Sequence, residues 1–203
     1  MIAIIDYGRG NLFSVEKAFV KLGADVVVTN DIEQIRNADK VVLPGVGAFG
    51  DCMHTLDELG LIPVVQEAAN SGKPFLGICL GLQLLFEGSE ESPGVVGLGI
   101  FKGKAKHIIA PELKVPHMGW NSLIMKNKSP LLENLPMHPY VYFVHSFHAV
   151  PEDPAIITAT TDYGSPLTAA VGKGNVQAMQ FHPEKSSSIG LKILENFVNR
   201  NSL

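Results

Sequence analysis

In the first half of the chain, short apolar runs alternate with amphipathic segments. The apolar runs predict buried strands, and the segments between them place apolar residues at helical spacing. We expect strands over 2–5, 25–29, 40–43 and 75–78, and helices over 11–22, 32–36, 50–58, 63–70 and 80–86. Because strands that alternate with helices pair in parallel, this rhythm predicts an α/β fold with helices on both faces of a sheet.

The second half has a different rhythm, in which strand-like runs follow one another with turn residues between them. We expect strands over 104–109, 140–145, 156–161, 168–171 and 176–180, and a closing amphipathic helix over 189–198. The segment 172–175 predicts a tight hairpin between the last two strands. We therefore expect antiparallel additions, in the C-terminal half, to a mostly parallel central sheet, all within a single domain over residues 1–203.

Composition and charge restrict the partners and the compartment. The chain has 203 residues, 46% hydrophobic and 18% charged, which is ordinary usage for a domain with a buried core. Its net charge of −4 gives no basic bias toward nucleic acid or an anionic membrane, so we expect neither partner. The start of the chain lacks the basic region of a signal peptide, and no apolar stretch is long enough to span a bilayer. We expect a cytoplasmic protein whose two cysteines stay reduced.

The first candidate for catalysis is a cysteine between a strand and a helix. An apolar strand runs into Gly77-Ile78-Cys79-Leu80-Gly81, the cysteine version of a nucleophile elbow. Glycines two positions before and after the nucleophile let neighbouring backbone approach, and the start of the following helix favours a thiolate. The N–H of Leu80 is then placed to hold an oxyanion. The alternative is that Cys79 is an inert residue buried in a tight turn.

The second candidate is a histidine paired with an acid near the C-terminus. The strand over 176–180 leads to His182-Pro183-Glu184. In an extended segment the two flanking side chains point the same way, so Glu184 can hold the imidazole while its other nitrogen faces a thiol. The alternative is a solvated or merely structural histidine. The other histidines, which lack this combination, are His54, His107, His117, His138, His145 and His148.

Four other features carry weaker signals. The glycine-rich loop 44–50 fits either a flexible turn or backbone that approaches an oxyanion closely. Gly8-Arg9-Gly10 is half of a dinucleotide fingerprint, but Phe13 replaces the third glycine, so we interpret it as a turn. Trp120 is an isolated aromatic that belongs either to the core or to a contact surface. Cys52 lacks an elbow, which indicates a structural role.

Taken together, these motifs resemble those of a known family. The segments 77–83 and 181–184 resemble the class I glutamine amidotransferases. Further segments resemble the branch of that family formed by the glutaminase subunits of imidazole glycerol phosphate synthases, namely 6–12, 43–50, 117–121 and 142–146. The similarity runs from residue 6 to residue 186, nearly the whole chain. Leu82 stands where many members of the wider family have histidine, which disfavours the anthranilate and GMP synthase branches.

This resemblance implies a three-layer fold of the class I amidotransferase type and a role for each matching residue. Cys79 is the expected nucleophile, His182 the general base and acid, and Glu184 its orienter. The resemblance further implies an oxyanion strand at Gly45, Val46 and Gly47, whose backbone rearranges when the partner binds its ligand. It places glutamine near Gln83, Ser146 and Phe147, and the partner interface near Asn11, Trp120, Tyr142 and Lys185.

The implied reaction releases ammonia from L-glutamine without a cofactor or a metal. The implied partner is a cyclase subunit with a (β/α)8 barrel, bound as a heterodimer, which uses the ammonia to make imidazole glycerol phosphate and aminoimidazole carboxamide ribotide in histidine biosynthesis. Three alternatives stay open: an amidotransferase subunit of another synthase, a stand-alone cysteine hydrolase acting on γ-glutamyl bonds, and a binding module without activity.

Overall fold

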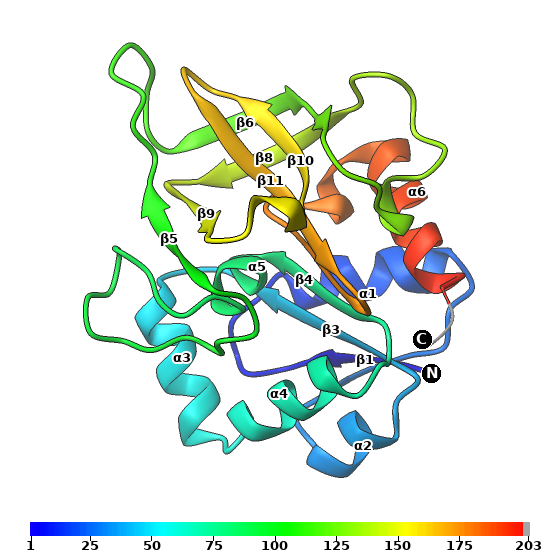
Figure 1. Cartoon of the computed structure of the whole chain (residues 1–203). Helices are drawn as coiled ribbons and strands as arrows, with labels where there is room; N and C mark the ends of the chain where they lie inside the picture. Colours follow the sequence, from blue (N-terminus) through cyan, green and yellow to red (C-terminus); the bar gives the residue numbers. More distant parts are fainter. Residues whose placement is uncertain (201–203) are drawn as a thin grey trace.

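The computed structural model describes residues 1–200 and places both halves of the chain on one central sheet (Figure 1). The first half has the expected alternation of strands and helices. Its elements are β1 (Ile2–Ile5), α1 (Leu12–Lys21), β2 (Val26–Thr29), α2 (Ile32–Asn37), β3 (Lys40–Gly45), α3 (Phe49–Glu58), α4 (Ile62–Asn70), β4 (Phe75–Cys79) and α5 (Leu80–Leu84).

The second half consists mainly of strands and ends in a helix. Its strands are β5 (Gly103–His107), β6 (His117–Ser122), β7 (Ile124–Met125), β8 (Tyr140–His145), β9 (Phe147–Pro151), β10 (Ile157–Asp162), β11 (Pro166–Lys173) and β12 (Val176–Met179). Short 3-10 turns and the last helix complete it, namely η1 (Pro130–Leu132), η2 (Pro154–Ile156), η3 (Pro183–Lys185) and α6 (Ser187–Val198).

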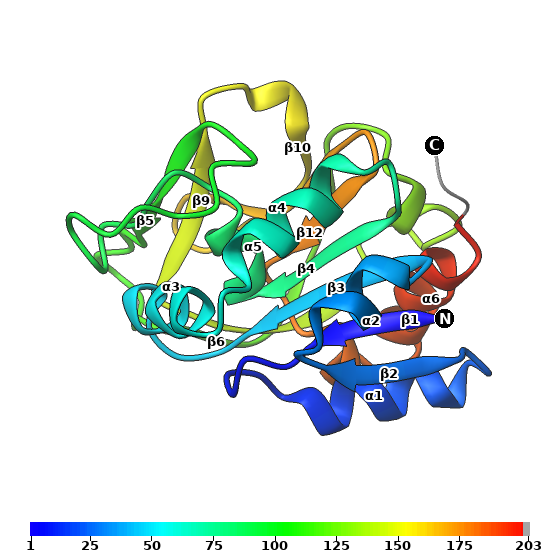
Figure 2. The ribbon, with the colours of Figure 1, turned by 90° about the horizontal axis from the view of Figure 1, so that it is seen from below.

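The central sheet has eight strands in the order β2-β1-β3-β4-β12-β11-β10-β7. The strands from β2 to β12 are parallel, whereas β11, β10 and β7 are added antiparallel. Figure 2 shows β4, β3, β1 and β2 side by side. The prediction of a mostly parallel sheet with antiparallel additions is therefore confirmed.

Two predicted strands lie outside the central sheet. The expected strands 104–109 and 140–145 correspond to β5 and β8, which pair with β9 and β6 in separate two-stranded sheets. The sequence prediction missed β6 and β9, so it had no partners for β5 and β8. In Figure 1, β6 and β8 lie near β10 and β11, the antiparallel strands of the central sheet.

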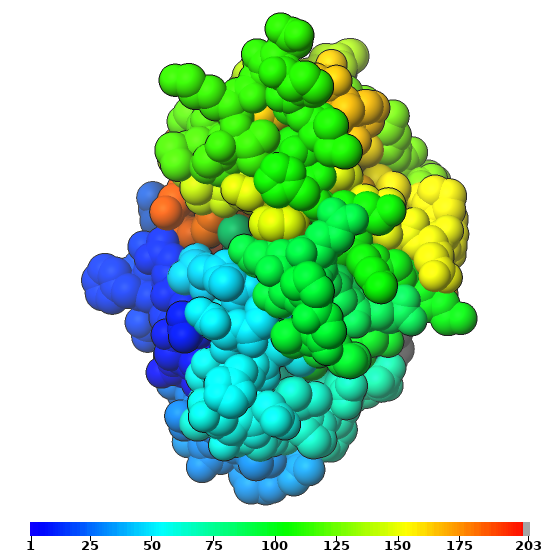
Figure 3. All heavy atoms as spheres, turned by 90° about the vertical axis from the view of Figure 1, so that its left-hand side faces the viewer, coloured from blue at the N-terminus to red at the C-terminus, as the bar shows by residue number. Residues whose placement is uncertain are grey.

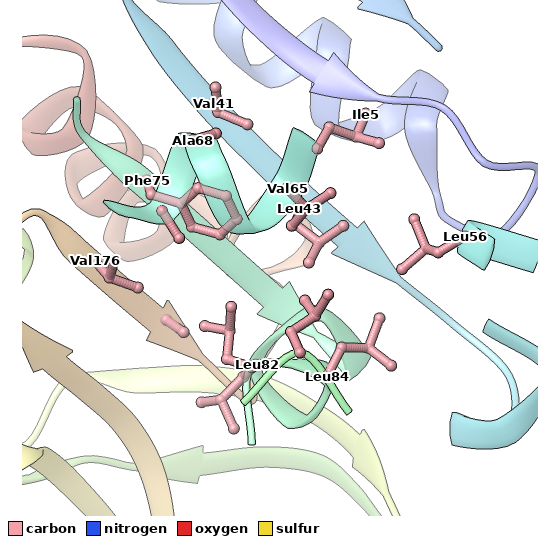
Figure 4. Close-up of a cluster of buried hydrophobic side chains, with 14 of the residues drawn as sticks. Ile5, Val41, Leu43, Leu56, Val65, Ala68, Phe75, Leu82, Leu84 and Val176 are labelled. Atoms are coloured by element: carbon pink, nitrogen blue, oxygen red, sulfur yellow. The ribbon is translucent and has the colours of Figure 1, made fainter. Parts of the chain in front are cut away.

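Apolar cores cover both faces of the sheet, as the alternation of strands and helices predicted. On one face, Val41 and Leu43 of β3 and Phe75 of β4 pack with Leu56 of α3 and Val65 of α4 (Figure 4). On the other face, α1 and α6 pack on the sheet and against each other, with the rings of Phe19 and Phe197 6.0 Å apart.

The topology sets the position of the candidate site. β3, β4 and β12 are adjacent parallel strands, so their carboxyl ends meet at one edge of the sheet. Gly45 ends β3, Cys79 ends β4, and His182 follows β12 by three residues. Residues that are distant in the sequence therefore converge at this edge.

Candidate active site

Cys79 sits on a sharp turn that only a glycine-flanked sequence can form. Its backbone has φ 56° and ψ −113°, a left-handed conformation that is costly for a side-chain-bearing residue. A Cβ on Gly81 would lie 2.0 Å from the carbonyl oxygen of Leu43, and one on Gly77 would lie 3.0 Å from the Gly81 carbonyl oxygen. The structure therefore has the strained elbow that the motif predicted. The Cys79 residue itself is buried, with 7% of its surface exposed.

His182 and Glu184 form a buried pair beside this turn. His182 Nδ1 lies 2.9 Å from Glu184 Oε1, and their side chains are 3% and 1% exposed. The backbone differs from the extended segment that we expected, because Pro183–Lys185 forms the 3-10 turn η3. This turn still brings the carboxylate back onto the imidazole. The backbone N–H of His182 donates to the Tyr142 carbonyl at 2.9 Å, which fixes His182 to β8.

The side chain of Asn11, at the start of α1, contacts the acid of this buried pair. It occupies the N-cap position of α1, but its side chain makes no capping hydrogen bond. Instead, Asn11 Nδ2 donates to Glu184 Oε1 at 3.3 Å. The same carboxylate oxygen thus accepts from both His182 and Asn11, so the residue before α1 helps to hold Glu184.

A cavity of about 330 Å³ opens above Cys79 and collects most of the predicted site residues. Figure 3 looks onto this side of the molecule, where orange atoms of the C-terminal region lie beside blue and cyan N-terminal elements. The lining contains the predicted residues Val46, Gly47, Cys79, Leu80, Gln83, Ser146, Phe147 and His182. Two buried atoms of this lining, His182 Nε2 and Gln83 Oε1, have no hydrogen-bond partner among the described residues.

The cavity also contains residues that sequence reasoning missed: Glu91, Pro116, Val144, His145 and Gln180. Gln180 is fully buried; its Nε2 lies 3.8 Å from Cys79 Sγ and its Oε1 accepts from Gln83 Nε2 at 3.0 Å. Its position two residues before His182 was an available signal, because strand ends beside a nucleophile supply site residues. The others come from loops and from β8, for which we found no sequence signal.

The predicted oxyanion strand lies directly next to Cys79. Gly45 is the register partner of Cys79 across the β3–β4 pair, and Val46 and Gly47 follow it along the edge of the cavity. Gly47 has φ 99°, a backbone conformation that favours glycine. The Val46 carbonyl accepts from the thiol of Cys52 at 3.5 Å. Cys52 is fully buried in α3, in agreement with the structural role predicted for it.

The charge state of His182 is set by its two neighbours. Burial alone lowers the pKa of His182, but the Cys79 thiolate and the Glu184 carboxylate together raise it to about 10. The raised pKa keeps this imidazole protonated at neutral pH, beside Cys79.

This raised pKa predicts a pH-dependent stability. The pKa of His182 lies above its ordinary value of 6.5, so the pairing stabilises the fold fully below pH 6.5 and is lost as pH rises through about 10. Glu184→Gln removes one cause of the shift, so its free energy of unfolding should fall furthest below wild type near pH 6 and approach it above pH 10. Urea unfolding near pH 6 and above pH 10 measures the free energy of unfolding of both proteins. The control is Glu58→Gln, at an exposed contact with His54, which should change little at either pH.

Three of the four predicted interface residues lie together on the outer face of β6, β8 and η3. The indole of Trp120 is 52% exposed and meets the Tyr142 ring edge-on, with centroids 6.2 Å apart. The Lys185 ammonium lies 6.0 Å from the Tyr142 ring centroid. Met118 is 61% exposed on the same strand as Trp120. Asn11, the fourth, contacts Glu184 instead.

The described residues offer neither a metal site nor a membrane segment. Among residues 1–200, no three His, Cys, Asp or Glu side chains are grouped so that they could hold a metal ion. Within the same range, no helix has the length and apolar character needed to cross a membrane.

Comparisons with known proteins agree with the fold and place the chain in a family. The family model for class I glutamine amidotransferases matches residues 3–201. Solved structures with similar folds include one titled "Crystal structure of glutamine amidotransferase", with a TM-score of 0.75, 18% identity and coverage of 97% of this chain and 99% of the other. PurLQS from Thermotoga maritima gives a TM-score of 0.72 at 21% identity, with coverage of 98% and 97%.

Curated sequences are much more similar. The imidazole glycerol phosphate synthase subunit HisH of Aquifex aeolicus is 53% identical, with 96% of this chain and 94% of the relative covered. The HisH subunit of Sulfurimonas denitrificans is 50% identical over the whole of both chains, and that of Geobacillus sp. strain WCH70 is 48% identical over 98% and 96%. The chain therefore belongs to the class I glutamine amidotransferase family and, within it, to the HisH subunits of imidazole glycerol phosphate synthase.

Proposed function

We propose that this chain hydrolyses L-glutamine to glutamate and ammonia and delivers the ammonia to a cyclase subunit with a (β/α)8 barrel. The cyclase uses it to form imidazole glycerol phosphate and aminoimidazole carboxamide ribotide. The observation that carries the proposal is the meeting of an elbow cysteine with a buried His–Glu pair at one cavity. Relatives of about 50% identity that are named synthase subunits support the choice of partner. Both cysteines are unpaired, which fits the proposed location in the cytoplasm.

The reaction starts from the thiolate–imidazolium pair. Cys79 Sγ attacks the carboxamide carbon of glutamine, and the carbonyl oxygen becomes a tetrahedral oxyanion. The Leu80 N–H and an N–H of the Gly45–Gly47 strand hold that oxyanion. His182 Nε2 gives its proton to the leaving nitrogen, so ammonia departs and a glutamyl thioester remains. His182, now neutral, takes a proton from water, and the hydroxide releases glutamate and restores the thiolate.

The cavity supplies groups of the right kinds for glutamine. Gln83, Ser146 and Phe147 present side-chain and backbone polar groups to the cavity, beside the nucleophile. Glu91 adds a carboxylate, which fits the α-ammonium group of an amino acid. A volume of about 330 Å³ suits a small substrate. We therefore propose that glutamine lies with its carboxamide over Cys79 and its α-amino end toward Glu91.

The outer face of β6 and β8 fits the partner surface. Exposed Met118, Trp120 and Tyr140 form an apolar surface, and Tyr142 and Lys185 lie beside Trp120. Aromatic residues of this kind anchor protein interfaces. The surface adjoins the site, because the Tyr142 carbonyl binds the backbone of His182. A partner that binds here would therefore contact Tyr142, whose carbonyl is hydrogen-bonded to the backbone of the proposed base, His182.

Glutamate release tests the proposed function. We expect the chain with the barrel and its nucleotide ligand to release glutamate much faster than the chain alone. In Trp120→Ala, the barrel concentration for half-maximal stimulation should rise about 30-fold, since a central interface aromatic contributes about 2 kcal/mol or more. The matched control is Val96→Ala, at an exposed apolar residue of the loop between α5 and β5, which should leave that concentration unchanged.

Other results would favour the competing functions. High activity of the chain alone, without a response to the barrel, would indicate a stand-alone hydrolase or a subunit of another synthase. An inert chain in the presence of the loaded barrel, with Cys79 unreactive toward alkylation, would indicate a binding module and contradict the proposal.

A further inference from the structure

A buried pair of histidines connects the proposed partner face to the glutamine cavity. His117 of β6 and His145 of β8 are register partners across the two-stranded sheet and are 2% and 6% exposed. His117 Nδ1 lies 2.9 Å from His145 Nε2. The ring of His117 stacks between Phe143 and Tyr163, with centroid distances of 4.7 and 4.1 Å. The proposed catalytic steps use neither imidazole.

The hydrogen bonds around this pair assign every proton. His145 Nδ1 lies 2.8 Å from the Phe147 carbonyl oxygen, which only accepts, so this nitrogen carries a hydrogen. In a neutral ring, His145 Nε2 then accepts from His117 Nδ1. His117 Nε2 in turn accepts from Asn121 Nδ2 at 3.3 Å. A proton added to either ring would bring two N–H groups face to face.

Burial keeps both rings neutral, as this pattern requires. It lowers the pKa of His117 to about 4 and that of His145 to about 3, although the Phe147 carbonyl acts in the opposite direction on His145. The chain of donors and acceptors therefore has one direction, from Asn121 to Phe147, throughout the neutral pH range.

This series of hydrogen bonds ends on the Phe147 carbonyl oxygen, which also binds a residue of the glutamine cavity. The Phe147 carbonyl also accepts from Gln83 Nε2 at 3.1 Å. The same nitrogen donates to Gln180 Oε1 at 3.0 Å, and Gln180 Nε2 lies 3.8 Å from Cys79 Sγ. The place of the Phe147 carbonyl therefore determines how the Gln83 amide is oriented beside the nucleophile.

We propose that His145, supported by His117, is a positioning residue for glutamine, because its Nδ1–H fixes the carbonyl that orients Gln83. The pair also ties this carbonyl to β6, the strand that carries Trp120 on its opposite face. His145 thus acts through Phe147 and Gln83 and does not touch the reacting atoms. The inference rests on the proposed glutaminase function.

Two amide substitutions separate this role from a merely structural one. In His145→Asn, the amide nitrogen takes the place of Nδ1 and still donates to Phe147, but the contact with His117 is lost. In His145→Gln, the amide oxygen takes the place of Nε2 and still accepts from His117, but the donor to Phe147 is lost. Each variant gives up one buried hydrogen bond, so we expect similar melting temperatures.

Their recognition of glutamine should differ. We expect KM for glutamine, measured with the loaded barrel, to rise about tenfold in His145→Gln and to stay within about threefold of wild type in His145→Asn. Alkylation of Cys79 by a chloroketone with the α-amino-acid end of glutamine should slow by the same tenfold in the Gln variant. Alkylation by iodoacetamide, which needs no recognition, should be equal in both.

Several outcomes would overturn the inference. Equal KM values and equal chloroketone rates in the two variants would do so, as would KM values that simply follow the melting temperatures. A slower iodoacetamide reaction in the Gln variant would also contradict it, because the residue would then act on the nucleophile. Failure of the proposed function is distinguishable, because the wild-type chain would then release no glutamate and would not prefer the chloroketone.

Discussion

Cys79→Ser should lower glutaminase kcat/KM by at least about 10³-fold while the fold survives. Serine has nearly the size and shape of cysteine, so the turn at φ 56° and its glycine neighbours need not move. The hydroxyl does not ionise beside His182 as a thiol does, so the charged pair that starts the reaction is absent. Steady-state glutamate release with the loaded barrel, together with thermal unfolding, checks both parts.

The second cysteine provides the control for this experiment. Cys52→Ser places a hydroxyl where a buried thiol contacts the Val46 carbonyl, so glutaminase activity should stay within about tenfold of wild type. A Cys79→Ser variant with more than a tenth of wild-type activity would show that this sulfur is not the nucleophile. Equal losses in both variants would indicate that the thiols act through structure.

The parallel half of the fold was predictable because its apolar pattern is local. β1, β3 and β4 are buried on both faces, so they appear in the sequence as continuous apolar runs. The predicted helical stripe of α1 likewise matches residues that are buried in the structure, among them Val15 and Phe19. In such segments, propensity, periodicity and tertiary burial agree, so the sequence alone indicates the element.

β6 was missed because its pattern is reversed. Its inward-facing residues include His117 and Asn121, whereas Met118 and Trp120 are exposed. A strand with polar groups inside and apolar groups outside does not match the pattern of a strand that faces a core. The exception has a physical reason. The inner face of β6 carries His117, which is hydrogen-bonded to His145, and its outer face belongs to the proposed partner surface. Deviation from the usual pattern thus marks a functional strand.

Some residues of the candidate site were predictable from local sequence, and others were not. Cys79, His182 and Glu184 were predictable because short motifs with special backbone requirements surround them. Gln180 and His145 become part of the site through packing between distant segments: one touches Gln83 and the other braces Phe147. Residue type does not distinguish them, and only Gln180, two residues before His182, had a local signal in the sequence. Their roles depend on strand pairing that the sequence alone did not establish.

The elbow itself can be tested through the glycine that follows the nucleophile by two positions. A Cβ on Gly81 would lie 2.0 Å from the Leu43 carbonyl oxygen and 3.0 Å from its carbon, so the backbone of β3 or α5 must shift. We expect Gly81→Ala to reduce the free energy of unfolding by about 1–3 kcal/mol or more. Because Gly81 and Leu80 are adjacent, the same shift moves the Leu80 N–H that we propose as an oxyanion donor.

A displacement of about 1 Å at such a site costs roughly 10²-fold in rate, so kcat should fall by at least that factor in the folded Gly81→Ala variant. Gly88→Ala is the matched control, since its Cβ would meet only the Val95 carbonyl oxygen, at 3.3 Å. It should retain most of its stability and activity. Urea unfolding and single-turnover kinetics give the two quantities separately. A Gly81→Ala enzyme with wild-type kcat would mean that close backbone approach at the elbow is unnecessary for catalysis.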